Sequence, residues 1–432
     1  MKKINTIHEM QTFLILWSGQ AFSALGSAMT AYALVIWTYQ QEGSALVTAF
    51  LMISSYTPYI LLSIFAGALS DRWNKKLTML VCDAIAAFTT IAVLCLLETG
   101  CLRIWHIYLI NAISGLMNTV QQPASEVAVT KVLPSQYYQK VGGLRYLASS
   151  VNSILTPIIT TAILGLFHIR AVIYFDLITF ACAFITLALF VKIPEDKQEL
   201  RVKESFIDTV RTGIVWLKQE KGIFHLMLFL AAINLTASMY NAAFPAMMLS
   251  RTGGSETVMG TVNAVIGIST LAGSIFAFFL KAPRSRIRVI CNCLLFSMCT
   301  ENFLLALGRN VWIWGLGGFL GWIAIPLMNT NLDVIYRKRI PAPIQGRVYS
   351  VRNALQFFTI PIGYFLGGIG VDYLCEPIMA KQNRRILTAL FGEGKGSGAA
   401  LFFFIIAFFG IAVCLSFRYD QHIWELEDNE NG

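Results

Sequence analysis

Charged residues are scarce in this chain of 432 residues. Asp, Glu, Lys and Arg make up 13% of it, whereas hydrophobic residues make up 56%, and the mean hydropathy is +0.63. Because soluble domains carry about 25% charged residues, this composition excludes a soluble protein. It indicates an all-α integral membrane protein that crosses the bilayer many times.

The chain also lacks the motifs of the common enzyme and metal sites. No GxxxxGK[ST] sequence occurs, so nothing indicates an ATP-binding loop. The nine cysteines show no metal-ligand spacing, and the five histidines lie far apart. We therefore expect no catalytic site, no metal and no cofactor.

The net charge of +9 could serve either nucleic-acid binding or contact with a membrane surface. Here the basic residues lie in short loops between apolar segments, which favours the membrane surface. We expect the lipid bilayer to be a partner and nucleic acid not to be one, and we expect a monomer.

Long apolar runs fill most of the sequence. A helix needs about 20 predominantly apolar residues to cross a bilayer. The first run is too long for the apolar region of a signal peptide, so we predict that it is retained as a span. Twelve transmembrane segments are predicted, at 13–37, 46–70, 77–97, 104–130, 144–167, 172–191, 223–249, 257–280, 286–307, 311–336, 348–371 and 399–418.

The charges between the spans indicate their direction. If the N-terminus lies in the cytoplasm, most of the 33 lysines and arginines fall in inner loops, as the positive-inside rule predicts. We therefore expect a multi-pass protein of the plasma membrane with both termini in the cytoplasm.

The longest polar insert, residues 192–222, separates two groups of six spans. Apolar residues recur within it at helical spacing, at Phe206, Val210, Ile214 and Leu217. This pattern predicts an amphipathic helix on the inner leaflet. We predict an N-terminal bundle at 1–191, and a C-terminal bundle at 223–432 that includes a long outer loop at 372–398 and a cytoplasmic tail.

The two halves carry an internal repeat at a spacing of 207 residues. One window maps without a gap onto the second half: Glu126, Val127, Lys131, Pro134, Lys140, Val141 and Arg145 onto Asp333, Val334, Lys338, Pro341, Arg347, Val348 and Arg352. Six spans separate the copies, so both copies face the same way. A parallel repeat of this kind favours a transporter of two six-helix bundles with a central site near the midplane of the membrane.

The stretch "GALSDRWNKK", residues 67–76, resembles the signature between helices 2 and 3 of the major facilitator superfamily. Further similarity lies in "WSGQAFSALGS", "QQPASEVAVTKVLP" and "PAPIQGRVYSVRNALQFFTIPIGYFLGG". In this order the motifs cover nearly the whole chain and resemble the drug:proton antiporter branch, which includes macrolide-efflux proteins. The resemblance implies the major facilitator fold and alternating access to a central site.

The signature is expected to form a conformational latch on the inner side of the membrane. Gly67 lets two helix backbones approach closely, and Asp71 can place its charge at a neighbouring helix N-terminus, near the start of helix 11. The latch is predicted to comprise Gly67, Asp71, Arg72, Lys75, Glu126, Asp333 and Arg347. The alternative is that this basic cluster only anchors the topology.

Within the latch, Glu126 is predicted to pair with Lys75 or Arg72. By the repeat, Asp333 should meet a basic residue of the loop between helices 8 and 9, namely Arg284, Arg286 or Arg288.

The sequence departs from the resembled family at three positions. Asn74 replaces the usual second glycine of the signature, and Lys75 replaces an arginine, which loses bidentate pairing and predicts a weaker latch. Asn111 stands where the family often carries an arginine implicated in proton coupling.

Polar residues within the spans are candidates for the substrate site, because an unsatisfied polar group in hydrocarbon is costly. Each of them has the alternative role of joining two helices. A neutral cavity for a small-molecule substrate is predicted from Gln20, Tyr56, Asn118, Gln121, Asn152, Asn234, Asn241, Asn263, Asn329 and Gln356.

Few acids lie at depth, and an Asp at a helix centre costs about 2.5–3.5 kcal/mol on the insertion scale. Each deep acid therefore needs a partner or a role in titration. By the architecture of the resembled family, helices 3, 6 and 9 are peripheral, so Asp83, Asp176 and Glu301 are not expected to line the central cavity. We predict that protons are coupled through Asp176 or, second, Glu301.

These features predict a secondary transporter that exports a hydrophobic or amphipathic small molecule, a macrolide-like drug or a secreted metabolite, by proton antiport. The alternative from another class is a lipid-handling flippase or a membrane enzyme on a transporter scaffold. The loop at 372–398 is either a tolerated insertion or a cap over the exit.

Overall fold

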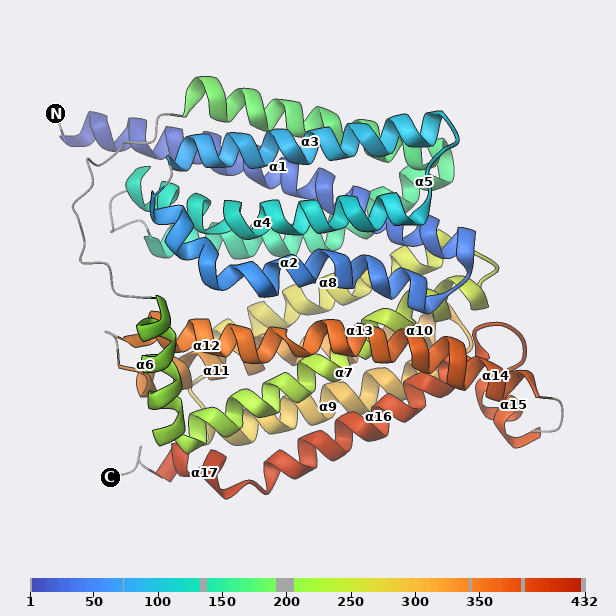
Figure 1. Cartoon of the computed structure of the whole chain (residues 1–432). Helices are drawn as coiled ribbons and strands as arrows, with labels where there is room; N and C mark the ends of the chain where they lie inside the picture. Colours follow the sequence, from blue (N-terminus) through green and yellow to red (C-terminus); the bar gives the residue numbers. More distant parts are fainter. Residues whose placement is uncertain are drawn as a thin grey trace. The chain divides into compact units, whose positions relative to one another are not determined.

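A computed structural model of the chain describes residues 2–72, 74–132, 138–191, 206–341, 344–381 and 385–428. All regular elements in these ranges are helices, and no strand occurs among them (Figure 1). The chain divides into two compact units. Unit 1 comprises Met1–Gln41 and Phe50–Leu200, and unit 2 comprises Glu42–Ala49 and Arg201–Gly432.

Five helices run through the described part of unit 1, drawn in blue to green in Figure 1: α1 (Lys2–Glu42), α2 (Ala45–Arg72), α3 (Lys75–Glu98), α4 (Ile104–Val132) and α5 (Tyr138–Phe190). Helix α5 is interrupted at His168, whose φ of 62° and ψ of 177° end one helical stretch and begin another. This interruption falls between the two segments predicted at 144–167 and 172–191.

Unit 2 contains more and shorter helices: α6 (Phe206–Gln219), α7 (Lys221–Arg251), α8 (Glu256–Phe279), α9 (Arg286–Leu307), α10 (Val311–Ile323), α11 (Ile325–Arg339), α12 (Gln345–Phe357), α13 (Thr359–Ile369), the π-helix η3 (Gly370–Cys375), α14 (Glu376–Ala380), α15 (Arg385–Phe391), α16 (Ser397–Arg418) and α17 (Gln421–Asp428). The break between α10 and α11 lies at Ala324, just before Pro326. A proline has no N–H to continue the helical ladder, which explains why one predicted span becomes two helices.

Ten helices of the described residues are long and apolar enough to cross a membrane. One of them, Ala148–Phe190, covers two predicted spans, and Val311–Arg339 joins α10 with α11. Helix α4 lies where the fourth span was predicted but is not among the ten. The all-helical membrane fold is therefore confirmed, whereas the count of twelve spans stays a prediction.

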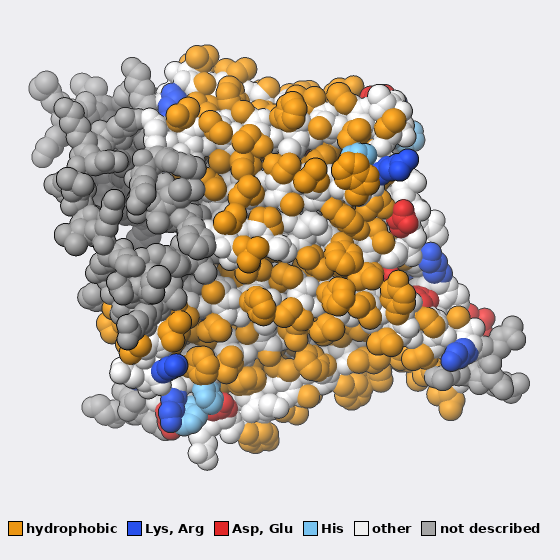
Figure 2. All heavy atoms as spheres, in the orientation of Figure 1, with side chains coloured by type: hydrophobic (Ala, Val, Ile, Leu, Met, Phe, Trp, Pro, Cys, Tyr) orange, Lys and Arg blue, Asp and Glu red, His pale blue; other side chains and the backbone are white. Residues whose placement is uncertain are grey.

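Large apolar side chains cover the helices on the outside. Phe88 of α3 is 71% exposed, Phe167 of α5 66% and Phe278 of α8 83%. Figure 2 shows hydrophobic side chains over the middle of the visible face, with the described charged side chains toward the helix ends. In water such a surface would be unfavourable, so it indicates contact with lipid.

Close helix contacts in unit 2 depend on small residues. A Cβ on Gly273 of α8 would collide with the carbonyl oxygen of Ile323, and a Cβ on Gly363 of α13 would lie 2.5 Å from the carbonyl oxygen of Leu235 on α7. These glycines let α8 approach α10 and let α13 approach α7, two of the closest helix pairs in the unit.

The amphipathic helix predicted in the linker is present as α6. Leu217 is 2% exposed and belongs to the apolar core of unit 2, whereas Ile214 and Val215 are exposed. Its position on the inner leaflet stays a prediction.

The segment at 372–398 is held by two carboxylates. Asp372 of η3 accepts hydrogen bonds from Ser44 Oγ at 2.6 Å, Leu46 N at 2.9 Å and Ala45 N at 3.1 Å, and so caps the start of α2. Glu376 accepts hydrogen bonds from Gly396 N at 2.9 Å and Ala399 N at 3.4 Å, at the start of α16. The segment therefore packs as part of unit 2.

Candidate functional site

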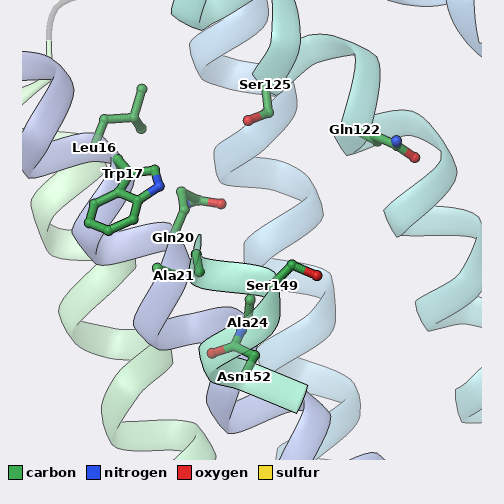
Figure 3. Close-up of a pocket in the computed structure, with 10 residues that line it drawn as sticks. Leu16, Trp17, Gln20, Ala21, Ala24, Gln122, Ser125, Ser149 and Asn152 are labelled. Carbon is green, nitrogen blue, oxygen red and sulfur yellow. The ribbon is translucent and has the colours of Figure 1, made fainter. Parts of the chain in front are cut away.

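A pocket of about 420 Å³ opens between α1, α4 and α5 of unit 1 (Figure 3). One wall is apolar and the other carries amides and hydroxyls. The lining residues are Leu16, Trp17, Gln20, Ala21, Ala24, Gln122, Ser125, Ala148, Ser149 and Asn152. Such a mixture suits an amphipathic ligand, because the apolar wall binds its body and the polar groups orient it.

Two of the predicted cavity residues, Gln20 and Asn152, line this pocket. The alanines at 21 and 24 provide the space, because larger side chains on this face of α1 would fill it. In Figure 3 the side chains of Gln20 and Ser125 point toward the space between the helices.

A buried acid, Asp83 of α3, is connected to the pocket through Gln20. It is 6% exposed. Gln121 Nε2 of α4 donates to its Oδ1 at 2.5 Å, and Gln20 Nε2 of α1 donates to its Oδ2 at 3.4 Å. Gln20 thus contacts both the acid and the pocket.

Sequence reasoning set Asp83 aside because its helix was expected to be peripheral. A signal was nevertheless present. Gln20 and Gln121 were both predicted to face a cavity, and two amides that converge from different helices need an acceptor at the same depth.

Asp176, on the second half of α5, is 3% exposed. Ser27 Oγ donates to its Oδ1 at 3.2 Å and Thr90 Oγ1 to its Oδ2 at 3.4 Å. A Cβ on Gly26 would lie 2.9 Å from Oδ1, so only glycine allows α1 to approach this carboxyl group. The partners of Asp176 are therefore hydroxyls, which can donate to a carboxylate and also accept from a carboxylic acid.

Glu301 of α9 is enclosed on the side of α10. It is 6% exposed, and Trp322 Nε1 donates to its Oε1 at 3.0 Å. A Cβ on Gly321 would lie 2.5 Å from Oε2, and one on Gly317 3.4 Å from the Glu301 carbonyl oxygen. Tyr240 of α7 is a neighbour of this acid. Its hydroxyl makes no hydrogen bond to any described group.

Three predicted cavity residues of unit 2 donate hydrogen bonds to helices, two of them to a helix other than their own. Asn234 Nδ2 donates to the carbonyl oxygen of Gln356 at 3.3 Å, and Gln356 Nε2 to Tyr336 Oη at 3.4 Å. Asn263 Nδ2 donates to Met259 O of its own helix at 3.1 Å. The first two contacts agree with the alternative role of joining helices.

The remaining predicted cavity residues are exposed on their units. They are Tyr56, Asn118, Asn241 and Asn329. That they share one central cavity with the others stays a prediction. Asn111, at the position of the family's arginine, donates to Leu51 O at 3.4 Å and so connects α4 with α2.

Most of the predicted latch lies outside what the structure describes. This holds for the side chains of Gly67, Asp71, Arg72, Glu126 and Arg347. Lys75 is buried, at 9% exposed, and Asp333 is exposed. The latch, its pairing of Glu126 with Lys75 or Arg72, and its pairing of Asp333 stay predictions.

Two neighbours of the predicted latch have structural roles that the sequence did not reveal. Asn74 Oδ1 accepts from Leu77 N at 2.8 Å, so the residue that replaces the family's glycine caps α3. Lys76 Nζ donates to the carbonyl oxygens of Ala188 and Val191, each at 2.8 Å, where the macrodipole at the end of α5 favours a cation.

On the second repeat, Arg286 Nη1 donates at 3.0 Å to Oδ1 of Asn331, which lies shortly before Asp333 on α11. The guanidinium of Arg352 lies 5.3 Å from the ring centroid of Tyr336 and 4.7 Å from that of Tyr349. Among the described residues, no group of His, Cys, Asp and Glu could hold a metal ion.

The comparison with protein families decides the class of this architecture. The model of the Major Facilitator Superfamily matches residues 16–364, most of the chain. This chain belongs to the Major Facilitator Superfamily. The resemblance inferred from the motifs is confirmed, and the chain is a multi-pass membrane transporter of this superfamily.

Relatives of known name lie at low identity. Macrolide efflux protein A of Streptococcus pyogenes is 22% identical over 372 residues, which cover 83% of this chain and 89% of that protein. Macrolide efflux protein A of Enterococcus faecalis is 21% identical over 325 residues, which cover 74% and 99%.

Solved transporters share the fold. The nucleoside transporter NupG superposes with a TM-score of 0.67 at 12% identity, covering 94% of this chain and 98% of its own. A D-xylose–proton symporter superposes with a TM-score of 0.66 at 12% identity, covering 95% and 97%. At such identities these two structures support the fold alone.

Proposed function

We propose that this transporter exports hydrophobic or amphipathic small molecules, macrolides among them, by proton antiport. The observation that carries the proposal is the similarity, over most of the chain, to two proteins named for macrolide efflux. The pocket of unit 1 supports it, because its apolar wall with Leu16 and Trp17 faces a wall of amides and hydroxyls. A substrate with an apolar body and several polar groups fits such a site.

Protons are the energy source in this proposal, since the sequence carries no ATP-binding motif. Each proton that moves down a membrane potential of 100 mV supplies about 2.3 kcal/mol. Asp176 and Glu301 are the proposed proton carriers. Both are buried, and no described lysine or arginine acts on either of them.

The surroundings of these two acids suit proton transfer in different ways. The hydroxyls of Ser27 and Thr90 can serve either protonation state of Asp176 by rotating. The indole of Trp322 can only donate, so it engages Oε1 of Glu301 and leaves Oε2 to carry a proton.

The excess of basic residues in the predicted inner loops supports an orientation with both termini in the cytoplasm.

The proposal is tested by accumulation of a radiolabelled macrolide in a susceptible bacterium that lacks its own drug pumps. Cells that express the chain should accumulate several-fold less than vector controls, and a protonophore should abolish the difference. Equal accumulation in both cells would reject macrolide export. Movement of a fluorescent phospholipid between leaflets, without drug efflux, would favour the flippase.

Conservative variants test the proton carriers in the same cells. Asp176→Asn and Glu301→Gln keep the shape of each side chain but cannot carry a proton, so we expect export to fall to the vector level in at least one of them. Membrane-inserted protein is quantified in parallel. If both variants export as the parent does, the proton carriers lie elsewhere.

A further inference from the structure

Asp83 is a buried acid whose described partners are two amides and no cation. Gln20 and Gln121 each donate one hydrogen bond to it, and no described lysine or arginine acts on it. Ionisation of a carboxyl group in such surroundings is costly unless a counter-charge is supplied. Within the described part of unit 1, that counter-charge is missing.

The pocket is the place from which a counter-charge can come. Gln20 lines the pocket and donates to Asp83 through Nε2. An amide that donates through nitrogen keeps its carbonyl oxygen as an acceptor, and Figure 3 shows the side chain of Gln20 pointing into the pocket. A ligand N–H group that donates to this oxygen therefore lies one side chain away from the carboxyl group.

Trp17 is a second, independent feature of the same pocket. Its indole ring belongs to the lining and lies about one helical turn before Gln20 on α1. The face of an indole attracts a cation. The other described lining groups, such as Ser125, Ser149 and Asn152, are neutral and do not repel one.

We propose that Asp83, acting through Gln20, makes the pocket of unit 1 a binding site for amphipathic molecules that carry a protonated amine. The ammonium group donates to Gln20 Oε1 and lies near Trp17, and the apolar body lies along the alanine side of α1. This inference rests on the proposed function, because it assigns the substrate class of the same pocket. Asp83 is a positioning residue here, since it acts through Gln20.

The test uses the purified full chain in lipid nanodiscs and two ligands, a dansyl-labelled alkylamine and its N-acetylated, neutral derivative. Fluorescence anisotropy measures the dissociation constant of each ligand. The parent protein should bind the amine about tenfold more tightly than the neutral derivative. This is a typical effect of one screened charge near a ligand. In Asp83→Asn this ratio should fall to about one, with the affinity for the neutral ligand unchanged.

The matched control is Glu98→Gln. It removes an acid from the same helix, but this acid is exposed and pairs with Arg170. The ratio of its dissociation constants for the two ligands should equal that of the parent. The inference is overturned if Asp83→Asn keeps the tenfold preference for the amine. It is also overturned if this variant loses affinity for both ligands equally.

Gln20→Leu gives a second variant in case Asp83→Asn does not fold, as judged by its thermal unfolding. It removes the acceptor in the pocket, so the ratio should again fall to about one, and a retained preference for the amine overturns the inference. Binding by the purified protein does not depend on export. A preference for the amine without macrolide efflux from cells would therefore refute only the proposed function, whereas efflux without any preference would refute only the inference.

Discussion

Asp83 of α3 and Glu301 of α9 are both buried acids, and their surroundings differ. Asp83 meets two amides and lies one side chain away from a pocket of about 420 Å³. Glu301 meets an indole N–H and the backbone of α10, where Gly321 leaves no room for a side chain. Acids of similar burial can therefore lie beside a pocket or be sealed between helices, and the neighbouring helix decides which.

The two acids also differ in how far their surroundings can rearrange. Glutamine amides are mobile groups that can turn toward a ligand, so the surroundings of Asp83 can adapt. Close-packed surroundings cannot adapt without a cost in packing, because protein interiors are as dense as organic crystals. This contrast agrees with the inferred role of Asp83 beside the pocket, whereas Glu301 stays, with Asp176, a proposed proton carrier.

Alanine variants of the two acids should show the largest difference. Glu301→Ala leaves the Trp322 N–H unpaired and a void between α9 and α10, so we expect the free energy of unfolding to fall by roughly 3 kcal/mol. Asp83→Ala should cost about 1 kcal/mol, because Gln20 can turn into the pocket. Thermal unfolding of the purified proteins in one detergent measures both.

Glu301→Gln is the control for that measurement, since the glutamine oxygen still accepts from Trp322. It should unfold close to the parent. Equal losses in the two alanine variants would show that the acids have equivalent surroundings, contrary to the comparison.

Glycine variants probe the same contrast through packing alone. A Cβ on Gly321 would lie 2.5 Å from Glu301 Oε2, whereas one on Gly19, beside Gln20, would lie 3.6 Å from Ala183 Cα. Gly321→Ala should therefore destabilise by about 1–3 kcal/mol. Gly19→Ala should be neutral or slightly stabilising, because alanine favours a helix by about 1 kcal/mol over glycine. The order of the two melting temperatures checks the prediction, and a Gly19→Ala protein less stable than Gly321→Ala would contradict it.

The class of the protein and most of its helices were predictable, because apolar length and loop charge depend on the local sequence. The amphipathic helix at α6 was predictable for the same reason, from a spacing of apolar residues. Asp83 illustrates the opposite case. Its acceptor role depends on Gln20 and Gln121, which come from two other helices, and no local pattern encodes their convergence.

Helix interruptions were harder to predict than helices. The break at Ala324 follows from Pro326, a signal present in the sequence. The interruption at His168 falls between the spans predicted at 144–167 and 172–191, but its positive φ of 62° was not predictable, because histidine seldom adopts such a conformation. Asn74 was interpreted as a weakened signature residue, and only the structure shows that it caps α3.

A variant of Trp17 tests whether the ligand binds in the pocket near Asp83. Trp17→Ala removes part of the apolar wall and the aromatic face, so the dansyl-labelled amine should bind about tenfold more weakly, equivalent to about 1.4 kcal/mol. The melting temperature should also fall, because the ring packs against the apolar core of unit 1, so binding is measured well below the unfolding temperature of each variant. Trp312→Ala is the control, since that ring is 84% exposed on α10 of unit 2. Equal affinities in both variants would place the ligand elsewhere.

Asp372 provides a third kind of carboxylate, one whose partners are the backbone N–H groups of Ala45 and Leu46 and the hydroxyl of Ser44. Such a contact caps a helix and offers nothing to a ligand. Ser44→Ala should therefore lower the free energy of unfolding by about 1 kcal/mol, the typical cost of losing a capping interaction. Ser54→Ala, the same change later in α2, removes only a hydrogen bond to Phe50 O of its own helix and should have no effect. The preference of the pocket for the amine should stay at the parental value in both variants, because neither residue lines it. A Ser44→Ala protein with normal stability but an altered preference would mean that the cap of α2 acts on the pocket, and would remove the distinction between structural and ligand-facing acids.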